Sequence, residues 1–176
     1  LGYDGSLSIK GSALKSRGLE KYLRSLTHDM IFYMLNDEAH KIKNAYNNYR
    51  QLIETRKMSI DDICKTETLT ESPKAYKLKV DEKKRNPAAQ YELAIKSGRE
   101  FQAGDQVSFY ITGDSKKVTA YSNCKLKEQF DEKEPDYNAA YYLDKLDSQY
   151  KKFSETAGLP ASAPSKDEDK DQGELF

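Results

Sequence analysis

The side chains that most often carry catalysis are sparse in this chain of 176 residues. It contains two histidines, His28 and His40, and neither is placed beside a candidate nucleophile. There is no glycine-rich loop of the phosphate-cradling type, and no cysteine and histidine cluster with zinc-ligand spacing. The carboxylates of Asp131, Glu132, Glu134 and Asp136 are better explained as a solvated loop whose last member caps a helix. We therefore expect this chain to catalyse nothing by itself and to hold no metal or other cofactor.

Basic side chains beside glycines and hydroxyls indicate a different chemistry, the binding of phosphates. Lys10, Lys15 and Arg17 flank Gly11 and Gly18, where a backbone without side chains can approach a phosphate closely. Two further groups of candidate phosphate ligands are Lys65, Thr66, Thr68 and Lys74 in a donor-rich loop, and Lys84, Arg85 and Asn86 at an expected helix N-terminus. Nothing resembles a recognition helix, so these groups predict binding that does not depend on nucleotide sequence.

The overall charge is zero, but its distribution along the chain is uneven. Residues 1–129 carry 23 basic and 17 acidic side chains, whereas residues 130–176 carry 6 and 12. A basic body with an acidic tail is typical of a surface that binds polyanions. No apolar run approaches the roughly 18–20 residues of a membrane span, and two cysteines are too few for a disulfide framework, which suits a reducing cytoplasm. Because the first residue is Leu1, we expect a piece of a longer protein.

Apolar periodicity predicts an α+β fold built on a helical hairpin. Two amphipathic helices are expected within 19–57, with a break at Asn36 and Asp37, and residues 64–85 show no clear period. The further elements expected are strand and turn in residues 1–18, a helix from Pro87 to Gly98, a β-hairpin with strands at 107–111 and 118–124, and a helix capped at Asp136 that ends near Phe153. Residues 154–171, rich in Ala, Ser, Pro and charge, predict a disordered tether.

The last five residues, 172–176, form a separate candidate motif. Gln172 could supply a hydrogen bond, and Leu175 and Phe176 could supply apolar anchors for a groove on a partner protein. At the end of a flexible tether, such a peptide is suited to docking.

Taken in order, these segments resemble the C-terminal end of a bacterial family B DNA polymerase of the DNA polymerase II type. Residues 3–11 and the run Arg17-Gly18-Leu19-Glu20 resemble the last palm hairpin and the start of the thumb. Residues 86–98 and 103–111 resemble a thumb helix that leads through a glycine turn into a strand. Residues 136–143 are similar to the family's Tyr-Asp-Ala-Glu-Tyr-Tyr-Ile segment, and residues 172–176 look like a bacterial sliding-clamp-binding peptide. At residues 21–26 the family's usual Arg-Arg-Asp-Trp-like run is replaced, so its contacts are not transferred.

The resemblance implies a division of the chain into the end of a palm (1–18), a thumb (19–153), a linker (154–171) and a clamp-binding peptide (172–176). It implies that the thumb grips primer–template duplex in the cytoplasm, at the nucleoid, and that the partners are double-stranded DNA, a sliding clamp and the palm. Magnesium and the carboxylates that hold it are expected in the parent palm. Two alternatives remain, a helical protein-interaction module that binds no DNA, and a single-strand-binding module in which the 13 tyrosines stack on bases.

The terminal motif generates a direct prediction. We expect Leu175→Ala combined with Phe176→Ala to abolish clamp binding and to spare DNA binding, because the apolar anchors are lost and the basic body is untouched. A pull-down with the bacterial sliding clamp measures the first effect and a duplex-binding assay the second. Clamp retention by the double variant would refute the assignment of the tail.

Overall fold

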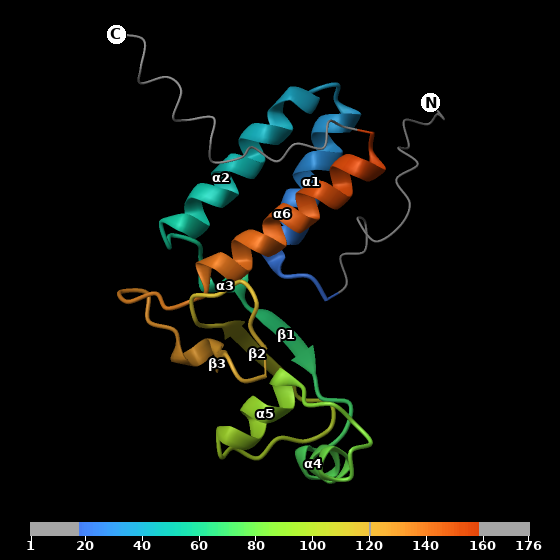
Figure 1. Ribbon diagram of the computed structural model, residues 1–176, viewed down its shortest axis with the longest axis vertical. Helices are drawn as coiled ribbons and strands as arrows, with labels where there is room; N and C mark the ends of the chain where they lie inside the picture. The colour runs from blue at the N-terminus through green and yellow to red at the C-terminus, as the bar shows by residue number, and fades with distance from the viewer. Residues whose placement is uncertain (1–17, 120, 159–176) are drawn as a thin grey trace.

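A layer of three helices forms one end of the molecule. In the computed structural model, which describes residues 18–119 and 121–158, α1 spans Lys21–Leu35 and α2 spans Ile42–Glu54, with the short 3₁₀ segment η2 at Ala39–Lys41 between them. This is the helical hairpin that the apolar spacing predicts. The last helix, α6 (Ala139–Thr156), contacts both of the first two helices (Figure 1). The buried faces of the three helices therefore share one core.

A small antiparallel sheet lies between this helical layer and a second, smaller pair of helices (Figure 1). Its strands are β1 (Lys65–Thr68), β2 (Gln106–Ile111) and β3 (Cys124–Leu126), in the spatial order β1-β2-β3. The remaining elements are α3 (Ile60–Ile63), which contacts α1, then α4 (Pro73–Asp81), α5 (Ala89–Lys96) and the 3₁₀ segment η3 (Lys127–Gln129). The α5 helix contacts β2 and β3, and α4 packs on α5. The fold is thus α+β, which confirms the predicted class.

Two elements occupy the segment for which periodicity predicted nothing. The β1 strand pairs with β2 in a register that places Thr66 opposite Ser108. The α4 helix begins after Ser72, whose Oγ accepts a hydrogen bond from the Ala75 amide at 3.2 Å, and Pro73 holds the first helical position. Both elements are shorter than ten residues, and this length hides the period of their few buried side chains.

Both later helices begin two residues later in the chain than predicted. The helix expected at Pro87 begins at Ala89, because Ala88 is extended and its amide donates to the Tyr76 hydroxyl at 2.9 Å. The predicted cap Asp136 is wrong as well. Its carboxylate accepts from the Tyr110 hydroxyl and from Lys125, and the side chain of Asn138 caps α6 instead. At its other end α6 continues through the buried Ser154, which the sequence assigned to the tether.

The predicted hairpin has a longer loop than its turn residues suggested. The first strand is where the alternation placed it, but the return strand is Cys124–Leu126, so most of the expected strand 118–124 is loop. The Asn138 side-chain amide donates to the carbonyls of Thr112 and Ser115, at 3.2 and 2.8 Å. These carbonyls are therefore satisfied by a side chain, and the backbone does not need to continue as a ladder there.

The expectations for residues 1–17 and 159–176 lie outside the described residues. They include the palm strand and turn, the candidate phosphate ligands Lys10, Lys15 and Arg17, most of the tether, and the terminal anchors Gln172, Leu175 and Phe176.

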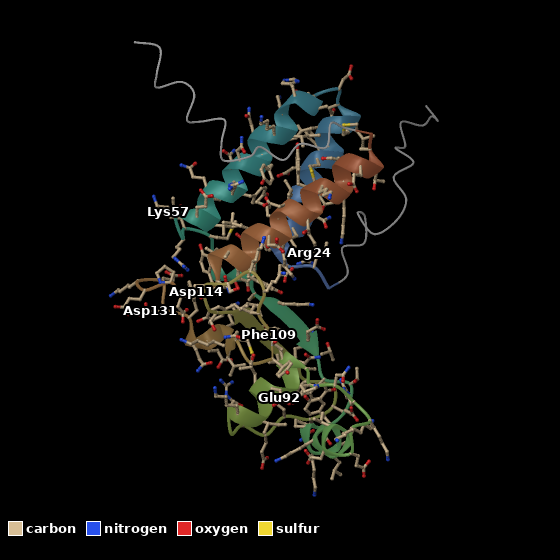
Figure 2. All side chains as sticks on the ribbon, in the orientation of Figure 1. Arg24, Lys57, Glu92, Phe109, Asp114 and Asp131 are labelled. Carbon is tan, nitrogen blue, oxygen red and sulfur yellow. The ribbon has the colours of Figure 1, made fainter. Side chains whose placement is uncertain are left out.

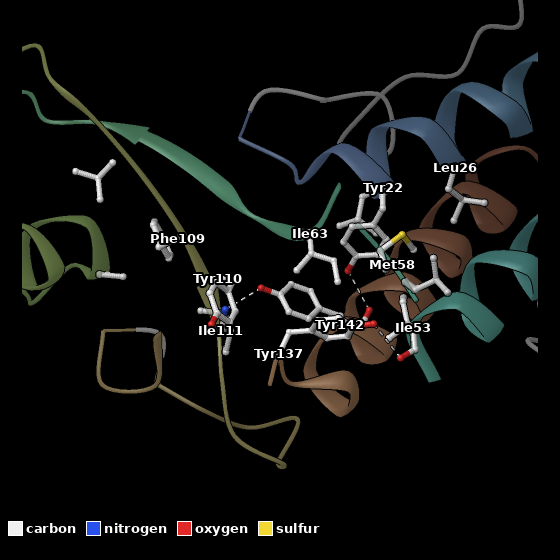
Figure 3. Close-up of a cluster of buried hydrophobic side chains, with 14 of the residues drawn as sticks. Tyr22, Leu26, Ile53, Met58, Ile63, Phe109, Tyr110, Ile111, Tyr137 and Tyr142 are labelled. Carbon is white, nitrogen blue, oxygen red and sulfur yellow. Dashed lines mark hydrogen bonds between the residues drawn. The ribbon is translucent and has the colours of Figure 1, made fainter. Parts of the chain in front are cut away.

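Tyrosines join the helical layer to the sheet. The hydroxyl of Tyr142 on α6 accepts a hydrogen bond from the Ile111 amide of β2 at 2.8 Å. The backbone carbonyl of the same residue accepts from the Tyr22 hydroxyl of α1 at 3.0 Å, and the two rings meet edge to face with centroids 6.0 Å apart. Figure 3 shows these bonds beside Tyr137, whose ring meets the Tyr142 ring edge to face with centroids 6.1 Å apart. One residue of α6 therefore connects this helix to α1 through its carbonyl and to the sheet through its hydroxyl.

The helices of the described residues differ from membrane spans. None of them combines the length and the apolar character that crossing a bilayer requires.

The Tyr142 junction generates a stability prediction. Tyr142→Phe keeps the packing of the ring but leaves the buried Ile111 amide without its acceptor, so we expect the free energy of unfolding to fall by about 1–3 kcal/mol. Urea unfolding followed by circular dichroism measures the change. The matched control is Tyr121→Phe at an exposed ring, which should stay within about 0.5 kcal/mol of the parent. Equal stability of Tyr142→Phe and the parent would show that the hydroxyl contributes nothing.

Candidate nucleic-acid interface

A polar groove of about 440 Å³ opens where the helical layer meets the sheet. It lies between the first turn of α1, the end of α3, the start of β1 and the η3 segment, and it is lined by Gly18, Leu19, Lys21, Arg24, Asp61, Cys64, Lys65, Thr66, Ser108 and Lys127. Arg24 is labelled in Figure 2, at the end of α1 that is nearer the sheet. The groove is thus formed by four separate parts of the sequence, which are residues 18–24, residues 61–66, Ser108 and Lys127.

Four cations reach this groove from both of its walls. Lys21 and Arg24 stand one turn apart on α1, so they share a helix face. Lys65 begins β1 and Lys127 begins η3, so these two come from the sheet side. Cations that converge from separate elements can contact neighbouring phosphates of one polyanion.

Three of these four cations have carboxylate partners at the rim. The Lys127 amine bonds to Asp61, the Lys21 amine lies 3.7 Å from Asp62, and the Lys65 amine lies 3.1 Å from Glu67. The hydrogen bond between Lys127 and Asp61 lowers the pKa of the aspartate carboxyl and raises the pKa of the lysine amine. Because these two shifts favour the charged forms, Asp61 and Lys127 both stay ionised near neutral pH. Arg24 forms no ion pair with any residue in the described part of the chain.

Hydroxyl groups continue the groove along the exposed face of the sheet. The Thr66 Oγ1 of β1 and the Ser108 Oγ of β2 are 2.7 Å apart, and both residues line the groove. Thr68 is exposed two residues further along the same strand, opposite Gln106. Such hydroxyls and amides can donate to phosphate oxygens without reading bases.

The predicted phosphate ligands therefore fall into separate places. Lys65 and Thr66 lie in the groove, and Thr68 lies beside it on the same strand. Lys74, Lys84 and Asn86 are exposed around α4, on the far side of the sheet from α1 (Figure 1). The Lys84 amine is 2.8 Å from Glu82. The donor-rich loop predicted over Lys65, Thr66, Thr68 and Lys74 is thus a strand followed by a helix, and Lys74 lies apart from the groove. Phosphate contact by all of these residues stays a prediction.

The Arg85 side chain contacts other residues of the fold. Its guanidinium bonds to Glu71 and lies 5.1 Å from the Tyr76 ring centroid and 4.6 Å from that of Tyr91. These two rings are stacked, with centroids 4.3 Å apart, and they join α4 to α5. Because the charge is already compensated by Glu71 and the aromatic faces, a role of Arg85 in DNA contact stays a prediction.

Three cations of the groove were missed by sequence reasoning. Lys21 and Arg24 directly follow the Arg-Gly-Leu-Glu run, and their spacing of three residues on a helix was a usable signal. For Lys127 there was no such signal, because its position depends on where β3 returns to the sheet. Ser108 could have been found as the polar residue between the buried Val107 and Phe109.

Groups that could perform chemistry do not gather around this groove. The described residues contain no cluster of three or more His, Cys, Asp or Glu side chains suited to a metal ion. Burial raises the pKa of the Cys64 thiol, and it raises that of Cys124 to about 11, so both thiols stay protonated near neutral pH. His28 and His40 are exposed on α1 and η2. The arrangement is suited to binding anions.

The fold and its groove describe an α+β domain with a cation-lined, hydroxyl-bearing surface. A family model described as DNA polymerase family B matches residues 9–155, which include every described residue of the groove. The chain therefore belongs to DNA polymerase family B, a family of DNA-directed DNA polymerases that act in replication and bind DNA. No curated protein sequence matches the chain.

The position of Arg85 generates a prediction that separates it from its neighbour. Arg85→Gln should lower the free energy of unfolding by about 1 kcal/mol, because Glu71 and the two stacked rings lose their cation. Lys84→Gln removes an exposed charge from the adjacent position and should change it by less than about 0.5 kcal/mol. Urea unfolding of both variants measures the difference. If the two variants unfold with equal free energies, Arg85 contributes no more to stability than an exposed surface residue.

Proposed function

We propose that this chain is the thumb region of a bacterial family B DNA polymerase of the DNA polymerase II type, which holds the primer–template duplex through phosphate and minor-groove contacts. The observation that carries the proposal is the groove in which Lys21, Arg24, Lys65 and Lys127 meet the hydroxyls of Thr66 and Ser108. These side chains match the sugar–phosphate backbone in charge and in donor character.

Continuity along the chain extends this surface in the proposal. Gly18 lines the groove, and Arg17 directly precedes it in the sequence, with Lys15 and Lys10 further upstream. We assign these three cations to the same backbone contact. Thr68 would extend the contact along β1, and Lys74, Lys84 and Asn86 would form an outlying part of it.

The proposal gives this chain a gripping role and no catalytic residue. Nucleotide addition would use magnesium ions held by carboxylates of the palm, which would be its partner within the same polymerase. The thumb would hold the newly made duplex behind that centre, in the bacterial cytoplasm at the nucleoid.

The terminal peptide has a separate proposed role, which is binding to a partner protein. We assign Gln172, Leu175 and Phe176 to a sliding clamp. Attachment there would raise the effective concentration of the polymerase on DNA without any new contact in the groove.

Two rival functions lead to different binding results. A protein-interaction module is favoured by Phe32 and Leu35, each 51% exposed at the end of α1, and it predicts indifference to DNA. A single-strand-binding module requires exposed rings for stacking. Seven tyrosines are instead among the most buried side chains of the described residues, namely Tyr22, Tyr46, Tyr76, Tyr91, Tyr110, Tyr137 and Tyr142. The family membership and the groove both favour duplex binding.

The groove is tested by fluorescence anisotropy of the full chain on a labelled primer–template duplex across a salt series. Arg24→Gln with Lys65→Gln should weaken binding about tenfold or more and make the log–log salt slope less steep by about 1.8, since two phosphate contacts are lost. The effect should be the same on unrelated duplex sequences.

The matched control is Lys116→Gln with Lys117→Gln, which removes the same charge from the loop beside Asp114, on the other side of the view in Figure 2. It should leave both affinity and slope nearly unchanged. Equal effects of the two double variants would mean that DNA is attracted by positive charge spread over the protein and does not bind at this groove in particular. Absence of duplex binding by the folded chain at low salt would contradict the proposed function.

A further inference from the structure

Two carboxylates of α3 form ion pairs with cations on opposite walls of the groove. Asp61 bonds to Lys127 on the sheet side, and Asp62 lies 3.7 Å from Lys21 on the helix side. The two acids are consecutive, so one short segment connects to both walls. Asp61 itself lines the groove. A phosphate that approaches Lys21 or Lys127 therefore meets a cation that already has an anionic partner.

The segment that holds these acids is fixed independently of the ion pairs. Ser59 caps α3 by accepting from the Asp61 amide at 3.3 Å, and Ile63 is fully buried against the core. Since the backbone is anchored on both sides of the acids, the segment that carries them keeps its place when the lysines change partner. The two acids are thus positioned as competing ligands and are not needed to hold α3 in place.

Exposure makes the exchange of partner easy. The Asp61 side chain is 62% exposed and the Lys127 side chain 41% exposed, so water and salt screen the pair. Exposed ion pairs of this kind are weak, whereas a row of DNA phosphates also releases condensed counterions when it is bound. A duplex can therefore displace the carboxylates, while an isolated anion with no counterions to release gains much less.

We propose that Asp61 and Asp62 are built-in competitors of the DNA backbone, which keep Lys21 and Lys127 oriented in the free protein and lower the affinity of the groove for polyanions. This inference rests on the proposed function, since it concerns the same groove. It assigns to acidic residues a role in setting how strongly, and over what range of salt, the thumb holds a duplex. The grip is thereby kept weak enough for the protein to move along its product.

The competition has a signature in salt. Because salt weakens the internal ion pairs as well as the contacts with phosphate, the penalty imposed by the carboxylates is largest at low salt and fades as the salt rises. Removing the carboxylates should therefore raise affinity most at low salt and make the log–log slope steeper.

The experiment compares the full chain with Asp61→Asn combined with Asp62→Asn, using duplex anisotropy across the salt series. We expect the variant to bind about three- to tenfold more tightly at low salt, with a steeper slope. The control, Glu132→Gln with Glu134→Gln, makes the same change in net charge in the loop after Asp131, which Figure 2 places away from Arg24. It should bind like the parent. If the double variant does not fold, the single variants Asp61→Asn and Asp62→Asn are measured in the same assay.

A double-mutant cycle with Lys127 identifies the cause. If Asp61 acts by competing for this lysine, then Asp61→Asn should strengthen binding in the parent and have less than about a twofold effect when Lys127→Gln is already present. A gain that persists without Lys127 would mean simple repulsion of DNA by the carboxylate, and it would overturn the inference.

The remaining outcomes separate this inference from the proposed function. If the parent binds duplex and the α3 variants bind no more tightly, the inference is overturned and the thumb assignment stands. If the folded parent does not bind duplex at low salt, both are overturned.

Discussion

The arrangement of the molecule depends on the hydrogen bonds of Tyr142. Its hydroxyl satisfies a backbone amide in the middle of the fold, and its carbonyl receives the Tyr22 hydroxyl from another helix. Hydrogen bonds in a buried setting are directional and costly to break, so they hold the helical layer and the sheet at a defined separation. The surrounding tyrosines add edge-to-face contacts, such as those of Tyr142 with Tyr137 and Tyr141, that restrict rotation of the rings.

This junction determines whether the groove exists. One wall of the groove belongs to α1, which carries Tyr22, and the other belongs to the sheet, which carries Ile111. The cations are on exposed, long side chains and cannot hold the walls together by themselves. Within the helical layer, Lys145 of α6 lies 2.8 Å from the buried Glu20 carboxylate just before α1, and this ion pair holds the start of that wall against α6. The binding surface thus has its geometry from the core and its chemistry from the rim.

The elements that sequence reasoning found were those with many turns or a regular alternation. The helical hairpin, the strand at Val107 to Ile111 and the final helix all bury enough side chains to produce a period. The short β1 and α4 elements do not, although Ser72 and Pro73 were a readable start signal. The errors at Asp136 and at the return strand both involve Asn138. Its cap of α6 is a local bond that Asn commonly makes, so it was readable from the sequence, whereas its bonds to the loop carbonyls of Thr112 and Ser115 depend on the tertiary fold. Of the groove, Lys65 and Thr66 were predictable from composition, whereas Lys127 required the tertiary fold.

The register of the sheet has a consequence for how this surface can change in evolution. Ser108 faces the groove only because Val107 and Phe109, its neighbours along β2, point into the core, and Thr66 reaches it only in the present pairing with β1. A shift of either strand by one residue would exchange the buried and exposed faces together. Insertions and deletions within these strands are therefore disfavoured, and the hydroxyl-bearing part of the groove is modified most readily by exchanging one side chain for another at fixed positions.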